Sequence, residues 1–213
     1  MVPSTWSTSA RGKALATSPI AVCIPWRPTP ERIPLLEVVR KNIASVWPVF
    51  TADSDGPVFS RSQAINRAVA QAFTAGHEVV VINDADTLCD RPSLGWATTL
   101  TLHDRKSRLP YDKYILMTKL QTDLFIHRGR VTGDEYVGAC SGVLVIHRET
   151  WDLLGGFDER YVGWGAEDVE FAIRHQFERV PGTCWGMWHP PAERGALTQA
   201  NMDRLRAENP GCN

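Results

Sequence analysis

Apolar and polar positions alternate in blocks along the first part of the chain. Residues 20–24 and 78–82 are short apolar runs rich in β-branched side chains, which predicts two buried strands. Between them, residues 31–46 and 64–73 carry apolar side chains at helical spacing, separated by a turn-rich segment at 51–57. Such alternation is typical of an α/β domain, and we expect its strands to be parallel and covered by helices on both faces.

Beyond residue 90 the pattern is mixed. It predicts a helix over about 93–102, strands near 114–117, 142–146 and 184–188, a glycine-rich loop over 155–165, a helix from Ala166, and a surface helix over 196–208. This mixture indicates α+β additions to the same sheet. Because no linker or repeat interrupts it, we expect one domain over residues 20–213, after a flexible polar leader over 1–19.

Charge and composition narrow the class of protein. The 213 residues include 23 Lys and Arg and 24 Asp and Glu, so the chain lacks the basic surplus that non-specific binding to nucleic acid requires. The five cysteines form no CxxC pair, which argues against a disulfide framework or a structural zinc site and favours a reducing, cytoplasmic compartment. No apolar run approaches the ~20 residues of a membrane span. Residues 1–19 also lack the apolar stretch of a secretory signal.

An acidic triplet follows the second buried strand. Asp84, Ala85 and Asp86 follow residues 79–82 after a single asparagine, at the strand end where open α/β sheets bind ligands. If the chain is still extended there, both carboxylates point the same way, so they can share a divalent cation or divide between a cation and a ribose hydroxyl. A metal held in this way would neutralise a diphosphate. Asp is also common in ordinary turns at strand ends, so the triplet alone does not distinguish a metal site from a turn.

The most informative stretch is the glycine-rich loop with the acidic turn that follows it. Gly163 and Gly165 allow the backbone to bend tightly about Trp164, which would present the indole to a ligand. Glu167 and Asp168 then occupy the first turn of a helix, where the helix dipole keeps a carboxylate base ionised near neutral pH. An acidic first turn is common by itself, but that does not explain an aromatic ring between two glycines beside paired carboxylates.

His189 is a further candidate metal ligand. It follows the strand expected at 184–188 and precedes two prolines. A neutral imidazole is a good ligand for borderline metals such as manganese. Partnership with Asp86 would distinguish His189 from a structural or surface histidine.

Four separated segments together resemble glycosyltransferases of the GT-A fold. Residues 25–27, Pro-Trp-Arg, resemble the P-x-R that contacts the nucleotide, and residues 59–66 resemble F-N-R-A-x-x-x-N. Residues 84–86 correspond to the D-x-D site for metal and sugar nucleotide, and 155–171 resemble the segment G-G-F-D-E-x-Y-x-G-W-G-x-E-D that builds the acceptor site and supplies the base. Over roughly residues 20–190, the chain is similar to the catalytic domain of the β-1,4-galactosyltransferases and, more distantly, to the polypeptide N-acetylgalactosaminyltransferases.

This resemblance implies a fold and a nucleotide site. The fold would be the GT-A form of α/β, a Rossmann-like sheet with helices on both faces and an α+β part for the acceptor. Residues 20–90 would form the nucleotide-binding half and 91–195 the acceptor-binding and catalytic half. The residues expected to contact the nucleotide sugar are Pro25, Arg27, Arg61, Asp84, Asp86, Trp164 and Gly165.

The resemblance also implies the chemistry. Asp86 and His189 would ligate Mn2+ or Mg2+, with Asp84 near the ribose or a metal-bound water. Asp168 would take the proton from the acceptor hydroxyl, assisted by Glu167. In the galactosyltransferases a methionine three residues before the histidine also ligates the metal, whereas Met187 lies two residues before His189 in this chain.

We therefore expect a metal-dependent glycosyltransferase that moves a sugar from a UDP-sugar to an acceptor hydroxyl. One base opposite the leaving group gives a single displacement, so inversion at the anomeric carbon is expected. The acceptor stays open among a glycan, a protein, a lipid-linked sugar and a modified DNA base. Since the membrane anchor of the Golgi enzymes is missing, the chain is interpreted as a bacterial or phage relative located in the cytoplasm.

Two other functions are weighed against this one. A nucleotidyltransferase should carry a glycine-rich basic loop after the first strand, and residues 25–28 contain no glycine. A non-catalytic module that binds a nucleotide or a carbohydrate would keep the tryptophans without turnover. The presence of all the candidate carboxylates and of His189 counts against such a module.

Overall fold

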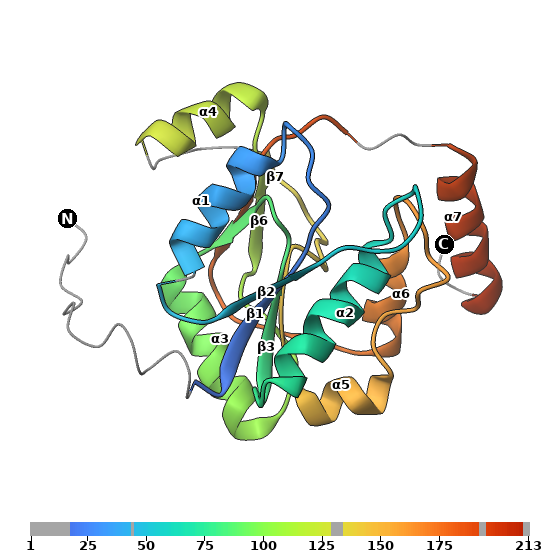
Figure 1. Cartoon of the computed structure of the whole chain (residues 1–213), viewed down its shortest axis with the longest axis horizontal. Helices are drawn as coiled ribbons and strands as arrows, with labels where there is room; N and C mark the ends of the chain where they lie inside the picture. The colour runs from blue at the N-terminus through green and yellow to red at the C-terminus, as the bar shows by residue number, and fades with distance from the viewer. Residues whose placement is uncertain (1–17, 44, 129–133, 192–194, 211–213) are drawn as a thin grey trace.

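The apolar runs predicted as strands lie at the centre of a six-stranded sheet. The computed structural model of the chain describes residues 18–43, 45–128, 134–191 and 195–210. The sheet has the order β2-β1-β3-β8-β5-β9 (Figure 1). Its strands are β1 (Ile20–Pro25), β2 (Val49–Ala52), β3 (Val79–Asn83), β5 (Arg108–Leu109), β8 (Val143–His147) and β9 (Glu178–Arg179). All residues of β3 and β8 are buried, as unbroken apolar runs predict for strands covered on both faces.

Strand direction differs between the two halves of the chain. β1 pairs in parallel with β2 and β3, as predicted for the first part, but β8 runs antiparallel to β3 and to β5. The pattern beyond residue 90 predicts no strand direction, and the complete sheet is mixed. The chain builds β4 to β7 between β3 and β8, and β8 starts opposite the end of β3, where Val143 pairs with Asn83. Apolar periodicity marks a buried strand but carries no information about the direction in which it runs.

A second, four-stranded sheet joins the two parts of the chain that carry candidate ligands. It has the order β4-β10-β6-β7. Its strands are β4 (Thr87–Cys89), β6 (Lys113–Leu116), β7 (Asp134–Glu135) and β10 (Thr183–Gly186). β10 pairs antiparallel with β4, with Gly186 opposite Thr87. The residues after β10 consequently lie beside the turn before β4.

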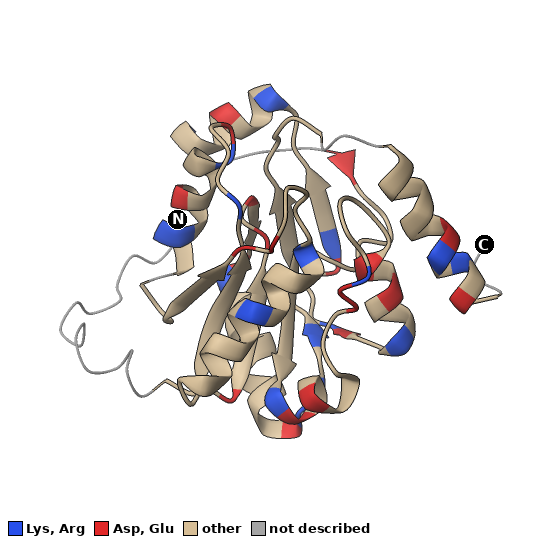
Figure 2. Cartoon of the chain, turned by 45° about the vertical axis from the view of Figure 1, so that its right-hand side comes forward, with Lys and Arg blue, Asp and Glu red and all other residues tan. Residues whose placement is uncertain are grey.

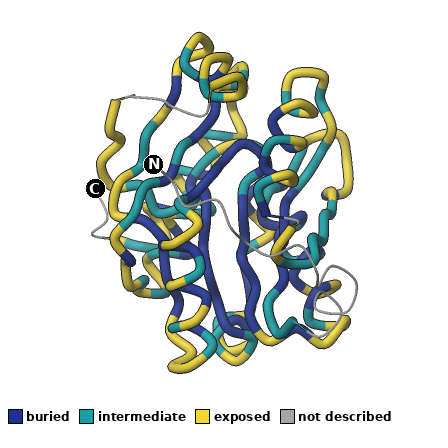
Figure 3. Tube along the Cα trace, turned by 90° about the vertical axis from the view of Figure 1, so that its left-hand side faces the viewer, coloured by how far each residue is buried: buried dark blue, intermediate teal, exposed yellow. Residues whose placement is uncertain are grey.

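Seven helices accompany these sheets in the described part of the chain. They are α1 (Ile33–Ile43), α2 (Arg61–Thr74), α3 (Arg91–Asp104), α4 (Lys119–Arg128), α5 (Arg148–Leu154), α6 (Glu167–Arg174) and α7 (Ala196–Glu208). α1 and α3 lie on one side of the main sheet and α2, α5 and α6 on the other, which confirms the predicted cover on both faces (Figure 1). Buried segments run through the middle of the molecule, between exposed outer segments (Figure 3).

Several elements have no counterpart in the prediction. β2, β4, α4 and α5 are short, and their residues do not form a long periodic pattern. α4 buries Thr122 and leaves Leu120 and Leu124 exposed, so it has no apolar stripe on a buried face. α1 ends at Ile43, before Val46, which the pattern includes in the helix. Residues 1–17 of the predicted leader lie outside the described residues.

Basic and acidic residues are intermixed in the fold. Lys and Arg are interspersed with Asp and Glu over the helices and loops in Figure 2. None of the helices that the structure describes is long and apolar enough to span a membrane.

Tyr114 on β6 packs between two glycines, which gives a test of the packing. A Cβ on Gly142 would lie 2.8 Å from Cε2 of Tyr114, and one on Gly186 would lie 2.8 Å from the tyrosine hydroxyl. Gly142 also has φ +95°, a conformation that side chains disfavour. We predict that Gly142→Ala lowers the free energy of unfolding by about 2–4 kcal/mol, the sum of overpacking and left-handed strain.

Gly138→Ala is the matched control. Gly138 has φ +85°, and a Cβ there would meet nothing within 4 Å. Its substitution should cost only the backbone strain, about 1–2 kcal/mol. Urea denaturation measures both values, and equal losses would contradict the packing of Tyr114 between the glycines.

Candidate active site

The acidic triplet occupies a turn that a buried asparagine holds. Asn83 ends β3, and its side-chain amide donates to the carbonyl of Asp84 at 2.7 Å and to that of Thr87 at 2.9 Å. The chain therefore turns at residues 85–86 instead of continuing extended. The condition for both carboxylates to point the same way, an extended chain, is not met, and each carboxylate pairs with a different arginine.

Asp86 lies at the centre of a small polar cluster. Its Oδ2 accepts a hydrogen bond from the guanidinium of Arg32 at 2.7 Å and lies 3.1 Å from Nε2 of His189. The Thr87 hydroxyl donates to Oδ1 at 3.3 Å. Burial opposes ionisation of Asp86, but the hydrogen bond from His189 and the charge of Arg32 outweigh burial and hold the pKa of this carboxyl below its usual range.

The second sheet brings His189 to this carboxylate. The amide of Met187, just after β10, donates to the carbonyl of Asp86 at 2.8 Å. Nδ1 of His189 lies 2.7 Å from the carbonyl of Pro190, and Nε2 faces the carboxylate of Asp86. Both oxygens can only accept, so both ring nitrogens donate and the imidazole is protonated when it pairs with Asp86 in this way. The hydrogen bond with Asp86 raises the pKa of the imidazole. Met187 itself is buried.

Asp86 and His189 fit a divalent cation with few protein ligands. Among the described residues, no three His, Cys, Asp or Glu side chains gather into a group that could hold a metal ion. The pair supplies one carboxylate oxygen and one imidazole nitrogen, which suit Mn2+. A cation held here would take its remaining ligands from water and from a bound anion, as Mg2+ does at phosphate sites.

Arg61 connects the acidic triplet to the acidic turn of α6. Ser60 caps α2 by accepting from the amide of Gln63, which leaves Arg61 in the first position of the helix. The guanidinium donates to Asp84 at 2.8 Å and to Glu167 at 3.4 Å. Burial disfavours a charged guanidinium, but these two carboxylates outweigh it and keep the pKa of Arg61 raised.

The two carboxylates at the start of α6 have different environments. Burial raises the pKa of Glu167 to about 7, and the charges of Asp168 and Asp84 act in the same direction against the opposing effect of Arg61. Asp168 is half-buried and accepts a hydrogen bond from the amide of Val169 at 2.8 Å. A carboxyl that titrates near neutral pH thus lies beside a second carboxylate that faces a pocket.

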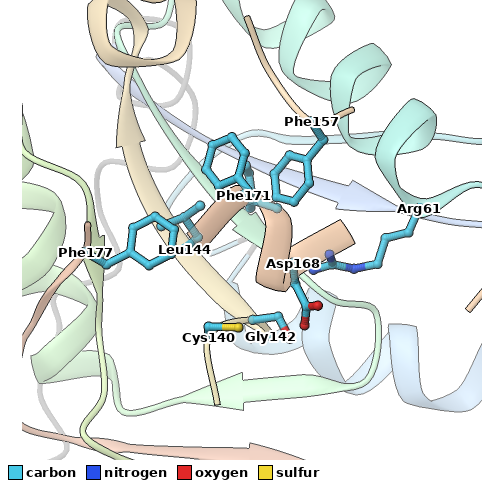
Figure 4. Close-up of a pocket in the computed structure, with 10 residues that line it drawn as sticks. Arg61, Cys140, Gly142, Leu144, Phe157, Asp168, Phe171 and Phe177 are labelled. Atoms are coloured by element: carbon cyan, nitrogen blue, oxygen red, sulfur yellow. The ribbon is translucent and has the colours of Figure 1, made fainter. Parts of the chain in front are cut away.

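That pocket combines a polar and an aromatic side. Its lining residues are Arg61, Ile82, Cys140, Ser141, Gly142, Leu144, Phe157, Asp168, Phe171 and Phe177. Figure 4 shows the Arg61 guanidinium directed toward Asp168, with the phenylalanine rings on the other side. Phe157 and Phe171 stack with ring centroids 4.2 Å apart, so they anchor the loop before α6 onto the core.

The loop over residues 155–165 is held against α2. The side chain of Asn66 donates to the carbonyl of Phe157 at 2.9 Å and accepts from its amide at 3.0 Å. Gly163 donates to the carbonyl of Phe59 at 3.1 Å. Gly163 and Gly165 have φ +79° and +102°, as the predicted bend about Trp164 requires, and 44% of Trp164 is exposed.

The segment after β1 fastens a neighbouring turn. Pro25 is buried at the end of the strand. Arg27 donates to the carboxylate of Asp53 at 2.9 and 3.0 Å and to the carbonyls of Ser54 and Pro57 at 2.6 and 3.1 Å. The structure thus uses Arg27 to fasten the turn after β2, and a contact of Arg27 with a nucleotide stays a prediction.

Sequence reasoning missed Arg32 and Thr87 as partners of Asp86. Thr87 is adjacent to the triplet, but its type alone does not distinguish a hydrogen-bond partner from a strand residue. Arg32 is 54 positions from Asp86. Its one signal is its place between a buried strand and a helix, at the sheet edge where α/β proteins bind ligands.

The comparisons with known proteins concern a segment of the chain and its fold. Residues 129–189 match the family model described as the N-terminal domain of galactosyltransferase. The catalytic domain of Drosophila β1,4-galactosyltransferase 7 superposes with a TM-score of 0.55 and 20% identity, covering 87% of this chain and 79% of that one. No curated protein sequence matches the chain.

Two further solved structures have the same fold. Glucosyl-3-phosphoglycerate synthase from Mycobacterium tuberculosis superposes with a TM-score of 0.50 and 18% identity over 97% of this chain and 85% of its own. GalNAc-T7 superposes with a TM-score of 0.52 and 14% identity over 88% of this chain and 47% of its own. The fold is therefore the GT-A fold, and with the matched segment it defines the class of the protein as a glycosyltransferase. The predicted resemblance and fold class are confirmed.

The raised pKa of Glu167 predicts a pH-dependent stability. A folded pKa of about 7 against an ordinary 4.5 means that the folded state holds this proton more tightly than the unfolded chain. The resulting stabilisation is complete below pH 4.5 and is lost as the pH rises through about 7. We predict that Glu167→Gln removes this loss, so that the variant gains about 3 kcal/mol relative to wild type from acid to alkaline pH.

Urea denaturation at about pH 4 and pH 8 measures this difference. Glu37→Gln is the control, since Glu37 is exposed on α1. Parallel stability curves for wild type and Glu167→Gln would contradict the raised pKa.

Proposed function

We propose that the protein is a metal-dependent glycosyltransferase that moves a sugar from a UDP-sugar to an acceptor hydroxyl. The observation that carries the proposal is the pairing of Asp86 with His189 beside the carboxylates of α6. Complexes of similar enzymes support the donor and the metal. A structure of the Drosophila enzyme, 19% identical, holds manganese, UDP-Gal and xylobiose, and the mycobacterial enzyme holds Mn2+, UDP-Glc and phosphoglyceric acid.

In this proposal Asp86 and His189 would hold Mn2+, and the bound ion would supply positive charge for the departing diphosphate. Asp84 stays with Arg61 and contributes to the ribose side of the nucleotide site. The partners of the two carboxylates support these separate roles. Asp86 lies 3.1 Å from His189, the other proposed metal ligand, whereas Asp84 lies 2.8 Å from Arg61. Pro25, Arg27 and Gly165 border the nucleotide-sugar site, and Trp164 offers its exposed ring to a sugar.

Asp168 is the proposed base. Its carboxylate faces the pocket, and it removes the proton from the acceptor hydroxyl as the bond to the sugar forms. Glu167 assists by setting the charge next to Asp168, since its own proton leaves near neutral pH. Attack opposite the leaving group inverts the anomeric carbon. The acceptor is a hydroxyl of a glycan, a protein, a lipid-linked sugar or a modified DNA base.

The division of roles predicts distinct variants. Asp168→Asn should lower the transfer rate at least about 100-fold, the contribution of a general base, and leave Mn2+ and UDP binding unchanged. Asp86→Ala should weaken Mn2+ and UDP binding together. Transfer and hydrolysis with a panel of UDP-sugars measure the first effect, and titration calorimetry measures the second.

Asp152→Asn is the control for both substitutions, because Asp152 is exposed on α5. Equal loss of Mn2+ binding in Asp168→Asn and Asp86→Ala would contradict the roles. Clear sugar binding by the wild-type protein, with no turnover of any donor, would instead favour a binding module.

The proposed ligand His189 predicts a pH-dependent metal affinity. Its imidazole must lose a proton to bind Mn2+, and its pKa is raised above the ordinary 6.5 by Asp86. Mn2+ affinity should therefore fall as the pH drops through this raised pKa, by up to about tenfold per pH unit. Mn2+ titrations over this range measure the slope. His189→Asn should bind more weakly with a flatter pH dependence, and an unchanged slope would exclude His189 as the ligand.

A further inference from the structure

Arg32 occupies the oxygen that the proposed metal would use. It precedes α1, and its guanidinium donates to Oδ2 of Asp86 at 2.7 Å. Nε2 of His189 lies 3.1 Å from the same oxygen. A cation bound between Asp86 and His189 would therefore compete with the guanidinium for this atom, and the like charges would repel each other.

The guanidinium also has an unused donor. Nε of Arg32 is buried and has no hydrogen-bond partner among the described residues. A buried N–H donor without an acceptor is unfavourable. Such groups commonly mark a place where a ligand or a water molecule accepts the missing hydrogen bond. A planar guanidinium with free N–H groups is well suited to the oxygens of a phosphate.

The two arginines of the site differ in how firmly they are held. Arg61 forms ion pairs with both Asp84 and Glu167, from two different elements. Arg32 forms an ion pair with Asp86 alone in the described part of the chain. When a metal neutralises Asp86, Arg61 keeps both of its ion pairs, whereas Arg32 loses the carboxylate to which it is hydrogen-bonded.

We propose that Arg32 exchanges partners: it pairs with Asp86 while the metal is absent and binds the diphosphate of the nucleotide sugar when a divalent cation takes Asp86. This inference rests on the proposed function. In this inference the diphosphate leaving group is bound by Arg32 as well as by the metal. It also couples the two ligands, because the metal must displace Arg32 and the diphosphate gives the displaced guanidinium a new anionic partner.

The exchange predicts how Mn2+ and UDP affect each other's binding. With Arg32 present, Mn2+ alone binds weakly and UDP strengthens Mn2+ binding. Arg32→Gln removes the competitor, so Mn2+ alone should bind several-fold more tightly, while UDP should bind more weakly in the presence of Mn2+. The enhancement of Mn2+ affinity by UDP should fall by about fivefold or more, within the usual range of coupling between two ligands.

Electron paramagnetic resonance of free Mn2+, with and without UDP, measures these affinities. Arg40→Gln is the matched control, since Arg40 is exposed on α1 and its loss changes the net charge equally. Arg32→Lys keeps the charge but not the planar fork, so it should restore part of the competition and less of the UDP binding. Thermal melting of each variant checks that it is folded.

Each outcome decides between the two proposals. Unchanged or weaker binding of Mn2+ alone by Arg32→Gln, beside a wild-type protein that binds Mn2+, would overturn the exchange of partners and leave the proposed function intact. The same holds if UDP enhances Mn2+ binding equally in wild type and variant. Failure of the wild-type protein to bind Mn2+ with or without UDP would overturn both proposals.

Discussion

The site depends on one guanidinium that is largely withdrawn from solvent. Arg61 comes from the start of α2 and joins Asp84, after β3, to Glu167, at the start of α6, and 17% of its side chain is exposed. A charge withdrawn from water to this extent is favourable only when it is neutralised and hydrogen-bonded, so these ion pairs hold the three segments together. The acidic turn of α6 is thereby held beside the strand end, which brings a candidate base and a candidate metal carboxylate into one site.

The rest of the site follows from two backbone connections. β10 pairs with β4 and delivers His189 to Asp86, while the 155–165 loop is fastened to α2 through Asn66 and Gly163. These connections divide the charges into two groups, Asp86 with Arg32 and His189, and Asp84 and Glu167 with Arg61. In the proposed exchange the first group trades one cation for another because Arg32 is paired with one carboxylate, whereas Arg61 in the second group is held by two.

Much of the fold could be predicted because its central strands are covered on both faces. Such strands need apolar side chains at every position, as in β1 and β3, and so they stand out from the polar residues around them. The short elements β2, β4 and α4 could not be predicted, because they bury few side chains and leave no periodic pattern. The antiparallel direction of β8 is equally invisible, since a strand has the same apolar pattern whichever way it runs.

The sequence by itself determined which chemistry is available: the paired carboxylates at 84 and 86, the tryptophan between glycines, the acidic turn at 167–168 and the histidine at 189. Local order along the chain is enough to recognise them. Only the tertiary structure decided how they are partnered. Arg32 and Asp86 are 54 residues apart, and Arg61 and Glu167 are 106 apart. An ion pair depends on distance in space and on burial, and both are set by the sheets that bring distant strands together.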